Sequence, residues 1–86
     1  MTPEQKQIIR ARLLRQLDDT RLHVDLPTLA INARLGGFRL TDGEVERELE
    51  YLIAKGFVSI STPAISHGLK LYRITAAGTE YVEANG

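Results

Sequence analysis

The stretch of sequence that decides the fold runs from residue 41 to residue 78 and reads TDGEVERELEYLIAKGFVSISTPAISHGLKLYRITAAG. It opens with Thr41 and Glu44 in the S/T-x-x-E spacing of a capping box, in which each side chain accepts a hydrogen bond from a backbone N–H at the start of a helix. Apolar residues then recur on one helical face: Val45, Leu49, Leu52 and Ile53. Gly56 can adopt the left-handed conformation that ends a helix. These signals predict a helix that begins after Thr41 and ends at Gly56.

Two short strands are predicted after this helix, at residues 57–61 and 69–74, because both segments are rich in β-branched or aromatic residues. The connection between them contains residues that are typical of turns: Pro63, Ser66 and Gly68. We therefore expect an antiparallel hairpin. Tyr72 and Arg73 lie on opposite faces of the second strand, and both faces are partly apolar, so the alternation leaves open which face is inward.

A short final helix is predicted after this hairpin. Thr75 can act as its N-cap, and Tyr81 and Val82 can anchor it to the core. Gly78 makes such a helix weak in isolation.

Two passages in this half of the chain carry a family resemblance, namely residues 48–58 (ELEYLIAKGFV) and residues 72–78 (YRITAAG). They resemble the "L-x-x-L-x-x-x-G-hydrophobic" and "Y-x-hydrophobic-T-x-x-G" patterns of winged helix-turn-helix domains of the MarR and PadR type. The resemblance covers about the last half of the chain well, and the first half only by the order of its helices. It implies that the third helix enters the DNA major groove and that the hairpin, the wing, touches the backbone or the minor groove.

The first helix is predicted to begin at a second capping box, Thr2 to Gln5, with Pro3 at the first helical position. One apolar stripe follows at steps of four residues: Ile9, Leu13 and Leu17. Further apolar residues lie off that stripe: Ile8, Ala11 and Leu14. They either pack against the C-terminal helix, which is the simpler interpretation, or contact a homodimer partner through helix one.

A second helix is predicted to start at the N-cap Asp25 and to end at Gly36 and Gly37. Its inward residues are expected to be Leu29, Ala30, Ala33 and Leu35. The predicted fold class is therefore mainly α with a small β-hairpin (α+β), a winged helix-turn-helix with a three-helix core, a wing and a short C-terminal helix.

Length and composition favour a single domain over residues 1–86, since 86 residues with 43% hydrophobic content form one small core. The element order and the resemblance imply that this is a single winged-helix domain. The chain has no cysteine, so neither disulfides nor a cysteine-based zinc site can hold it. No apolar run approaches the ~20 residues that a membrane helix needs, and the N-terminus begins a capped helix instead of a secretion signal. We expect a cytoplasmic protein without a membrane partner.

The charge balance argues against a simple DNA-binding interpretation, because 11 basic and 11 acidic residues give a net charge of zero. On the outward side of the third helix Arg47 stands among carboxylates, and a carboxylate about 4 Å from a phosphate is repelled by about 1 kcal/mol even in bulk water. Glutamate can accept a hydrogen bond from cytosine, but phosphate contacts elsewhere are then needed. The nucleic-acid-binding candidates lie in the turn before the third helix, on that helix and in the wing: Arg34, Arg39, Thr41, Arg47, Tyr51, His67 and Lys70.

Catalysis and metal binding are not expected. His23 and His67 are far apart in the sequence and lack neighbouring ligands at metal-binding spacing, and no serine has the histidine and acid pattern of a nucleophile. No glycine-rich phosphate loop is present. We therefore predict a protein that is not an enzyme and has no cofactor. It binds double-stranded DNA as a small bacterial or phage-type transcriptional regulator; the alternative is a winged-helix protein-interaction module that binds no DNA and uses the acidic third helix or the apolar side of helix one.

Overall fold

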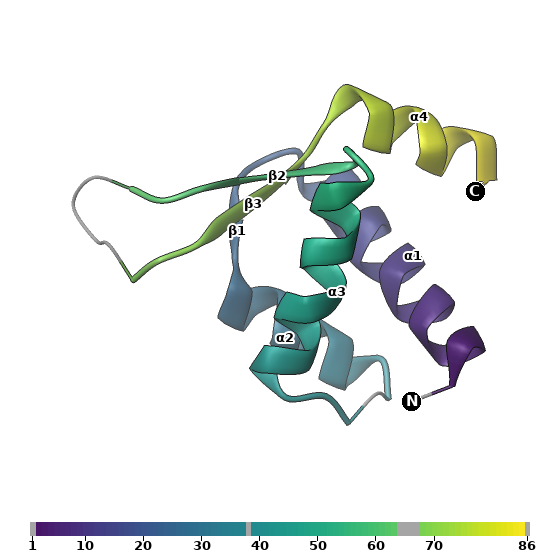
Figure 1. Cartoon of the computed structure of the whole chain (residues 1–86), viewed down its shortest axis with the longest axis vertical. Helices are drawn as coiled ribbons and strands as arrows, with labels where there is room; N and C mark the ends of the chain where they lie inside the picture. The colour runs from purple at the N-terminus through teal and green to yellow at the C-terminus, as the bar shows by residue number, and fades with distance from the viewer. Residues whose placement is uncertain (1, 38, 64–67, 86) are drawn as a thin grey trace.

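The computed structural model describes residues 2–37, 39–63 and 68–85, and within them the chain forms four helices and three short strands (Figure 1). In chain order these elements are α1 (Pro3–Thr20), β1 (Val24–Asp25), α2 (Leu26–Leu35), α3 (Asp42–Ala54), β2 (Val58–Ser61), β3 (Leu71–Ile74) and α4 (Ala76–Asn85). The β2–β3 hairpin extends away from the helices to one side, α3 runs through the middle of the molecule, and α2 lies beside α3 (Figure 1).

The helix starts follow the predicted caps. The hydroxyl of Thr41 accepts a hydrogen bond from the N–H of Glu44 at 3.2 Å, and the carboxylate of Glu44 accepts one from the N–H of Thr41 at 3.0 Å. A second capping box joins Thr2 and Gln5 at the start of α1, and Asp25 caps α2. Gly56 has a φ of +82°, so the chain leaves α3 through the left-handed conformation that glycine tolerates.

The sheet has three antiparallel strands in the order β1-β3-β2, with β3 in the centre. Tyr72 of β3 lies opposite Val24 of β1 on one side and Ile60 of β2 on the other. The strand β1 was not predicted from the sequence, because two residues are too few to show an alternating pattern. The regular part of β3 is also shorter than the predicted 69–74.

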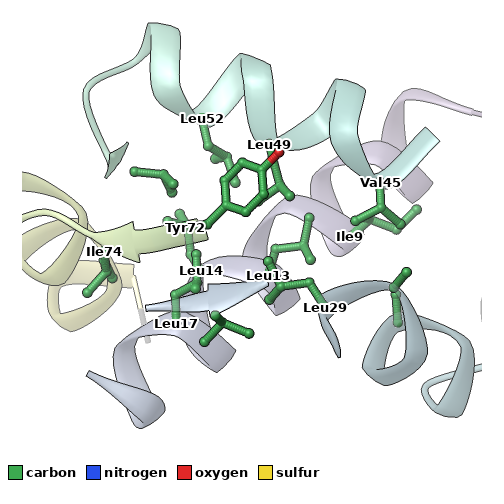
Figure 2. Packing of buried hydrophobic residues seen from close by; sticks show 14 of the residues in the cluster. Ile9, Leu13, Leu14, Leu17, Leu29, Val45, Leu49, Leu52, Tyr72 and Ile74 are labelled. Carbon is green, nitrogen blue, oxygen red and sulfur yellow. The ribbon is translucent and has the colours of Figure 1, made fainter. Parts of the chain in front are cut away.

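The core is formed by buried apolar residues of α1, α2 and α3 around the middle of β3, and α4 adds the partly buried Val82. Tyr72 is 0% exposed, and Figure 2 shows its ring among leucines of α1 and α3 with the hydroxyl directed toward α3. The predicted stripe of α3 does turn inward, since Val45, Leu49 and Leu52 are buried and Ile53 packs against the cluster. Tyr72 and Ile74 are buried while Arg73 is exposed, which decides the face that the sequence left open.

Two predictions about buried residues need correction. Leu35 was expected to face inward but is 80% exposed, because α2 turns by about 200° in the two residues after the buried Ala33 and so places Leu35 on its opposite side. Tyr81 is 44% exposed and only its ring face is covered, by stacking on Phe57 at a centroid distance of 4.7 Å. Of the extra apolar residues of α1, Leu14 is buried, whereas Ile8 stays 52% exposed.

A tight junction fixes α4 to the start of the hairpin. The hydroxyl of Thr75 donates to the carbonyl of Gly56 at 2.6 Å and accepts from the N–H of Gly78 at 3.1 Å, which confirms Thr75 as the N-cap. The N–H of Thr75 donates to the carbonyl of Phe57 at 3.0 Å. A Cβ at Gly78 would lie 2.2 Å from that carbonyl oxygen, so glycine is the residue that allows this close approach.

Candidate nucleic-acid interface

The candidate interface is the outer side of α3 together with the adjoining hairpin. The burial of the Val45–Leu52 side leaves the opposite side of α3 in solvent, where Gly43, Arg47 and Glu50 are exposed along one line of the helix at steps of four and three residues. An exposed helix face of this length beside a hairpin has the dimensions needed to enter a major groove.

Most of the carboxylates on α3 have a partner within the chain. Glu44 closes the capping box, and the backbone N–H of Thr41, with its hydroxyl, lowers the pKa of Glu44. Asp42 pairs with Arg34, Glu46 with Lys70, and Glu48 with Arg10. Five acidic residues lie on α3, and within the described residues Glu50 alone among them makes no hydrogen bond or ion pair. The acidic character of this helix is therefore largely neutralised internally.

Arg34 connects the two helices of the helix-turn-helix. Its Nε donates to the carbonyl of Leu40 at 2.9 Å, and its Nη2 donates to the carboxylate of Asp42 at 2.6 Å. Arg34 and Arg39 line one shallow depression with Thr41, so the structure brings these three predicted residues together. Arg34 and Thr41 nevertheless already have structural roles, as a clasp across the turn and as a helix cap.

Lys70 immediately precedes β3, and its ammonium donates to the carboxylate of Glu46 on α3. This hydrogen bond, and the negative charge of Glu46, raise the pKa of Lys70. The pair ties the hairpin to α3. Lys70 must therefore leave this ion pair, or bridge Glu46 and the DNA, in order to contact a phosphate.

Glu48 is the buried ionisable residue that sequence reasoning missed. It is 3% exposed, and its carboxylate accepts a hydrogen bond from Nε of Arg10 at 2.7 Å. The Arg10 guanidinium also covers the ring of Tyr51, 3.6 Å from the ring centroid, and the Lys55 ammonium lies 5.6 Å from the same ring. The signal was present in the spacing, because Glu48 is three residues after Val45 and four before Leu52 and so falls on the apolar face of α3.

Three of the predicted candidates, Arg34, Thr41 and Lys70, already have hydrogen-bond partners within the chain. Among the described residues Arg39 and Arg47 are exposed and make no hydrogen bond or ion pair, although the charge of Arg47 contributes to the lowered pKa of Glu44. Tyr51 is half-exposed and partly covered by Arg10. The remaining predicted residue, His67, lies outside the described residues.

Within residues 2–37, 39–63 and 68–85 no cluster of three or more histidine, cysteine, aspartate or glutamate side chains could hold a metal ion. None of the helices in that part of the chain is both long and apolar enough to cross a membrane.

Neither a protein-family model nor a curated protein matches this chain. Among solved structures, the chain is similar to a mutant of MepR from a multidrug-resistant clinical isolate of S. aureus, with a TM-score of 0.78 and 20% sequence identity. The match covers 98% of this chain and 64% of the MepR chain, so this chain spans less than two thirds of that protein. This likeness and the element order of the chain, four helices with a three-stranded antiparallel sheet, show that the chain has a winged-helix fold of the MarR-like type.

Proposed function

We propose that the chain is a DNA-binding winged-helix domain of a small transcriptional regulator, with α3 entering the major groove and the β2–β3 hairpin contacting the DNA backbone. The observation that carries this proposal is the exposed side of α3, where Arg47 makes no ion pair within the described residues. The hairpin projects beside this helix and is joined to it by the Glu46–Lys70 pair. The likeness to MepR supports the arrangement of these elements, and the function rests on their exposure and chemistry.

The neutral net charge is compatible with this function, because the internal ion pairs remove much of the acidity that a phosphate would meet. Arg39 is free of ion pairs within the described chain and lies next to Thr41, at the N-terminal end of α3, where helix N–H groups also favour anions. Arg73 is exposed on the outer face of β3 and adds a cation to the hairpin. We assign Arg39 and Arg73 to phosphate contacts. The proposed role of the protein is regulatory and not catalytic, and its proposed location is the cytoplasm.

The test is fluorescence anisotropy with a labelled duplex of random sequence at about 50 mM salt and again at about 200 mM salt. A protein that makes phosphate contacts releases counterions, so its affinity is expected to fall steeply between the two conditions. Arg39→Ala and Arg47→Ala are each expected to weaken binding while leaving the melting temperature unchanged. No binding at the lower salt concentration would overturn the proposal.

A second candidate function is a protein-interaction module. It is favoured by the exposed apolar side chains of α1 and α2, namely Ile8, Ile31 and Leu35, and by the pairing of Arg34 and Lys70 with carboxylates. A homodimer formed through α1 would use the same side chains and is compatible with either function. The absence of duplex binding in the salt experiment would favour this second candidate.

A further inference from the structure

We propose that Arg47 and Glu50 form a base-reading pair that selects a guanine and a neighbouring cytosine in the major groove, and that Gly43 gives α3 the clearance to reach them. This inference rests on the proposed DNA-binding function. It goes further because it names the side chains that set sequence preference and the bases that they prefer.

Elimination identifies the pair. On α3, every other charged side chain has a task inside the chain: Asp42 holds Arg34, Glu44 closes the cap, Glu46 holds Lys70 and Glu48 holds Arg10. Arg47 and Glu50 are both exposed, and no hydrogen bond or ion pair within the described residues engages either of them. They are therefore the charged groups of α3 that can meet a base edge without first breaking a contact.

Their spacing suits neighbouring base pairs. Residues three apart on a helix lie on one side of it and about 4.5 Å apart along its axis, while successive base pairs are about 3.4 Å apart. The guanidinium of an arginine can donate two hydrogen bonds to O6 and N7 of guanine, and a glutamate carboxylate can accept one from the amino group of cytosine. An arginine followed three residues later by a glutamate thus favours a step that contains both bases.

Gly43 lies on the same line of α3, four residues before Arg47, and the fold does not require a glycine there. A Cβ at this position would have a single neighbour within 4 Å, the hydroxyl of Thr41 at 3.9 Å, so nothing in the described chain demands the small residue. Glycine in a helix costs up to about 1 kcal/mol relative to alanine. A glycine that packing does not need, on the exposed line of a groove-entering helix, is accounted for by close approach of the DNA to the helix backbone.

The experiment is selection of bound duplexes from a random-sequence pool, carried out with the unchanged chain and with Arg47→Ala, Glu50→Ala and Gly43→Ala. Matched controls are Arg15→Ala and Glu83→Ala, which remove the same charges from exposed positions on α1 and α4. Thermal melting of each variant establishes that it is folded. The affinity of each protein is then measured for the selected duplex and for duplexes in which a single base pair is changed.

The unchanged chain is expected to select a guanine and an adjacent cytosine, and replacing either base should weaken binding roughly 5- to 150-fold. Arg47→Ala should abolish the discrimination at the guanine, and Glu50→Ala that at the cytosine. Glu50→Ala should bind duplexes that lack this cytosine more tightly than the unchanged chain does, because it removes a charge that phosphates repel. Gly43→Ala should weaken binding without lowering the melting temperature, and the controls should keep both base preferences.

Two failures are distinguishable. If the unchanged chain enriches no duplex and binds none at low salt, the proposed DNA-binding function is wrong. If it binds DNA but Arg47→Ala and Glu50→Ala retain its base preferences, the function stands and the base-reading pair is wrong. Retention of full affinity by Gly43→Ala would remove the role assigned to that glycine.

Discussion

Arg10 joins the interior to the candidate interface. It pairs with the buried carboxylate of Glu48 and covers Tyr51. Removing the arginine leaves a charge that is 3% exposed without a partner. We expect Arg10→Ala to lower the free energy of unfolding by roughly 3 kcal/mol, near the lower end for an orphaned buried charge because Arg10 itself is partly exposed.

Urea denaturation of the single and double variants checks this assignment. Arg10→Met combined with Glu48→Leu replaces the pair by apolar groups and should recover most of the lost stability. If the double variant is as unstable as Arg10→Ala, the cost comes from lost packing of Arg10 and not from the unpaired carboxylate.

The sequence located several candidate residues but not their partners. Arg34 and Lys70 are surface cations by pattern, and their engagement with Asp42 and Glu46 spans 8 and 24 residues, a separation at which sequence spacing carries no geometric information. Glu48 was not predicted to be buried, because its partner Arg10 lies 38 residues away in the sequence and only the apolar residues of that face of α3 were assigned to the core. The predicted nucleic-acid contacts themselves stay predictions.

At the level of elements, the start of α3 has a pH dependence that can be worked out. The pKa of Glu44 is lowered from 4.5 in the folded chain, chiefly by the hydrogen bond from the N–H of Thr41. A lowered folded pKa means that the carboxylate stabilises α3 above about pH 4.5 and that this contribution is lost as the pH falls through the folded value. Glu44→Gln keeps an acceptor for the cap and does not titrate.

We therefore expect the melting temperature of the unchanged chain to fall relative to that of Glu44→Gln as the pH is lowered from 6 toward 3. Scanning calorimetry at a series of pH values provides the comparison. A constant difference between the two proteins over this range would show that the Glu44 carboxylate does not contribute as the capping box requires.

The junction of α4 with the hairpin gives a contrast between two glycines in helices. Gly78→Ala places a Cβ 2.2 Å from the carbonyl oxygen of Phe57 and 2.7 Å from Cγ1 of Ile74, so backbone must move, and we expect a loss of roughly 1 to 3 kcal/mol. Gly43→Ala meets open space and should be neutral or stabilising by up to about 1 kcal/mol. Equal effects in urea denaturation would contradict the close approach at Gly78.

Most elements could be predicted because their signals are local. The N-caps Thr2, Asp25 and Thr41 each mark a helix start through a signal that is only four residues long, and Gly56 marks the end of one helix. β1 depends on pairing with the distant β3, which local patterns do not encode. The exposure of Leu35, by contrast, follows from helical periodicity, because Leu35 lies about 200° around α2 from the buried Ala33. The sequence assigned Gly78 only a cost, whereas the structure shows the contact that requires it.

On the scale of the whole molecule, the winged-helix fold is confirmed by both the element order and the likeness to MepR. The count of one domain stays a prediction, as does the homodimer. The extra apolar surface of α1 proved to be divided: Leu14 packs inside, as the simpler interpretation required, and Ile8 remains in solvent next to exposed side chains of α2. A homodimer contact through α1 would therefore involve Ile8 and not Leu14, which is already buried within the chain.

If α1 forms a homodimer, Ile8→Glu should convert it to a monomer in sedimentation equilibrium without lowering the melting temperature, since this side chain is 52% exposed in the single chain. Leu22→Glu is a matched control, because Leu22 is exposed in the segment that follows α1. A chain that is already monomeric, or a dimer unaffected by Ile8→Glu, would exclude this surface as the interface.

The enclosed phenol of Tyr72 provides an intrinsic optical reporter for a chain without tryptophan. Burial raises the pKa of Tyr72 above 10.0, and its hydroxyl has no hydrogen-bond partner in the described chain. Because the folded pKa is raised, the stabilisation is complete below about pH 10 and is lost as alkali ionises the ring. The near-ultraviolet phenolate signal of Tyr72 should thus emerge together with separation of the sheet from its helices, which allows alkaline titration to follow that separation without a label.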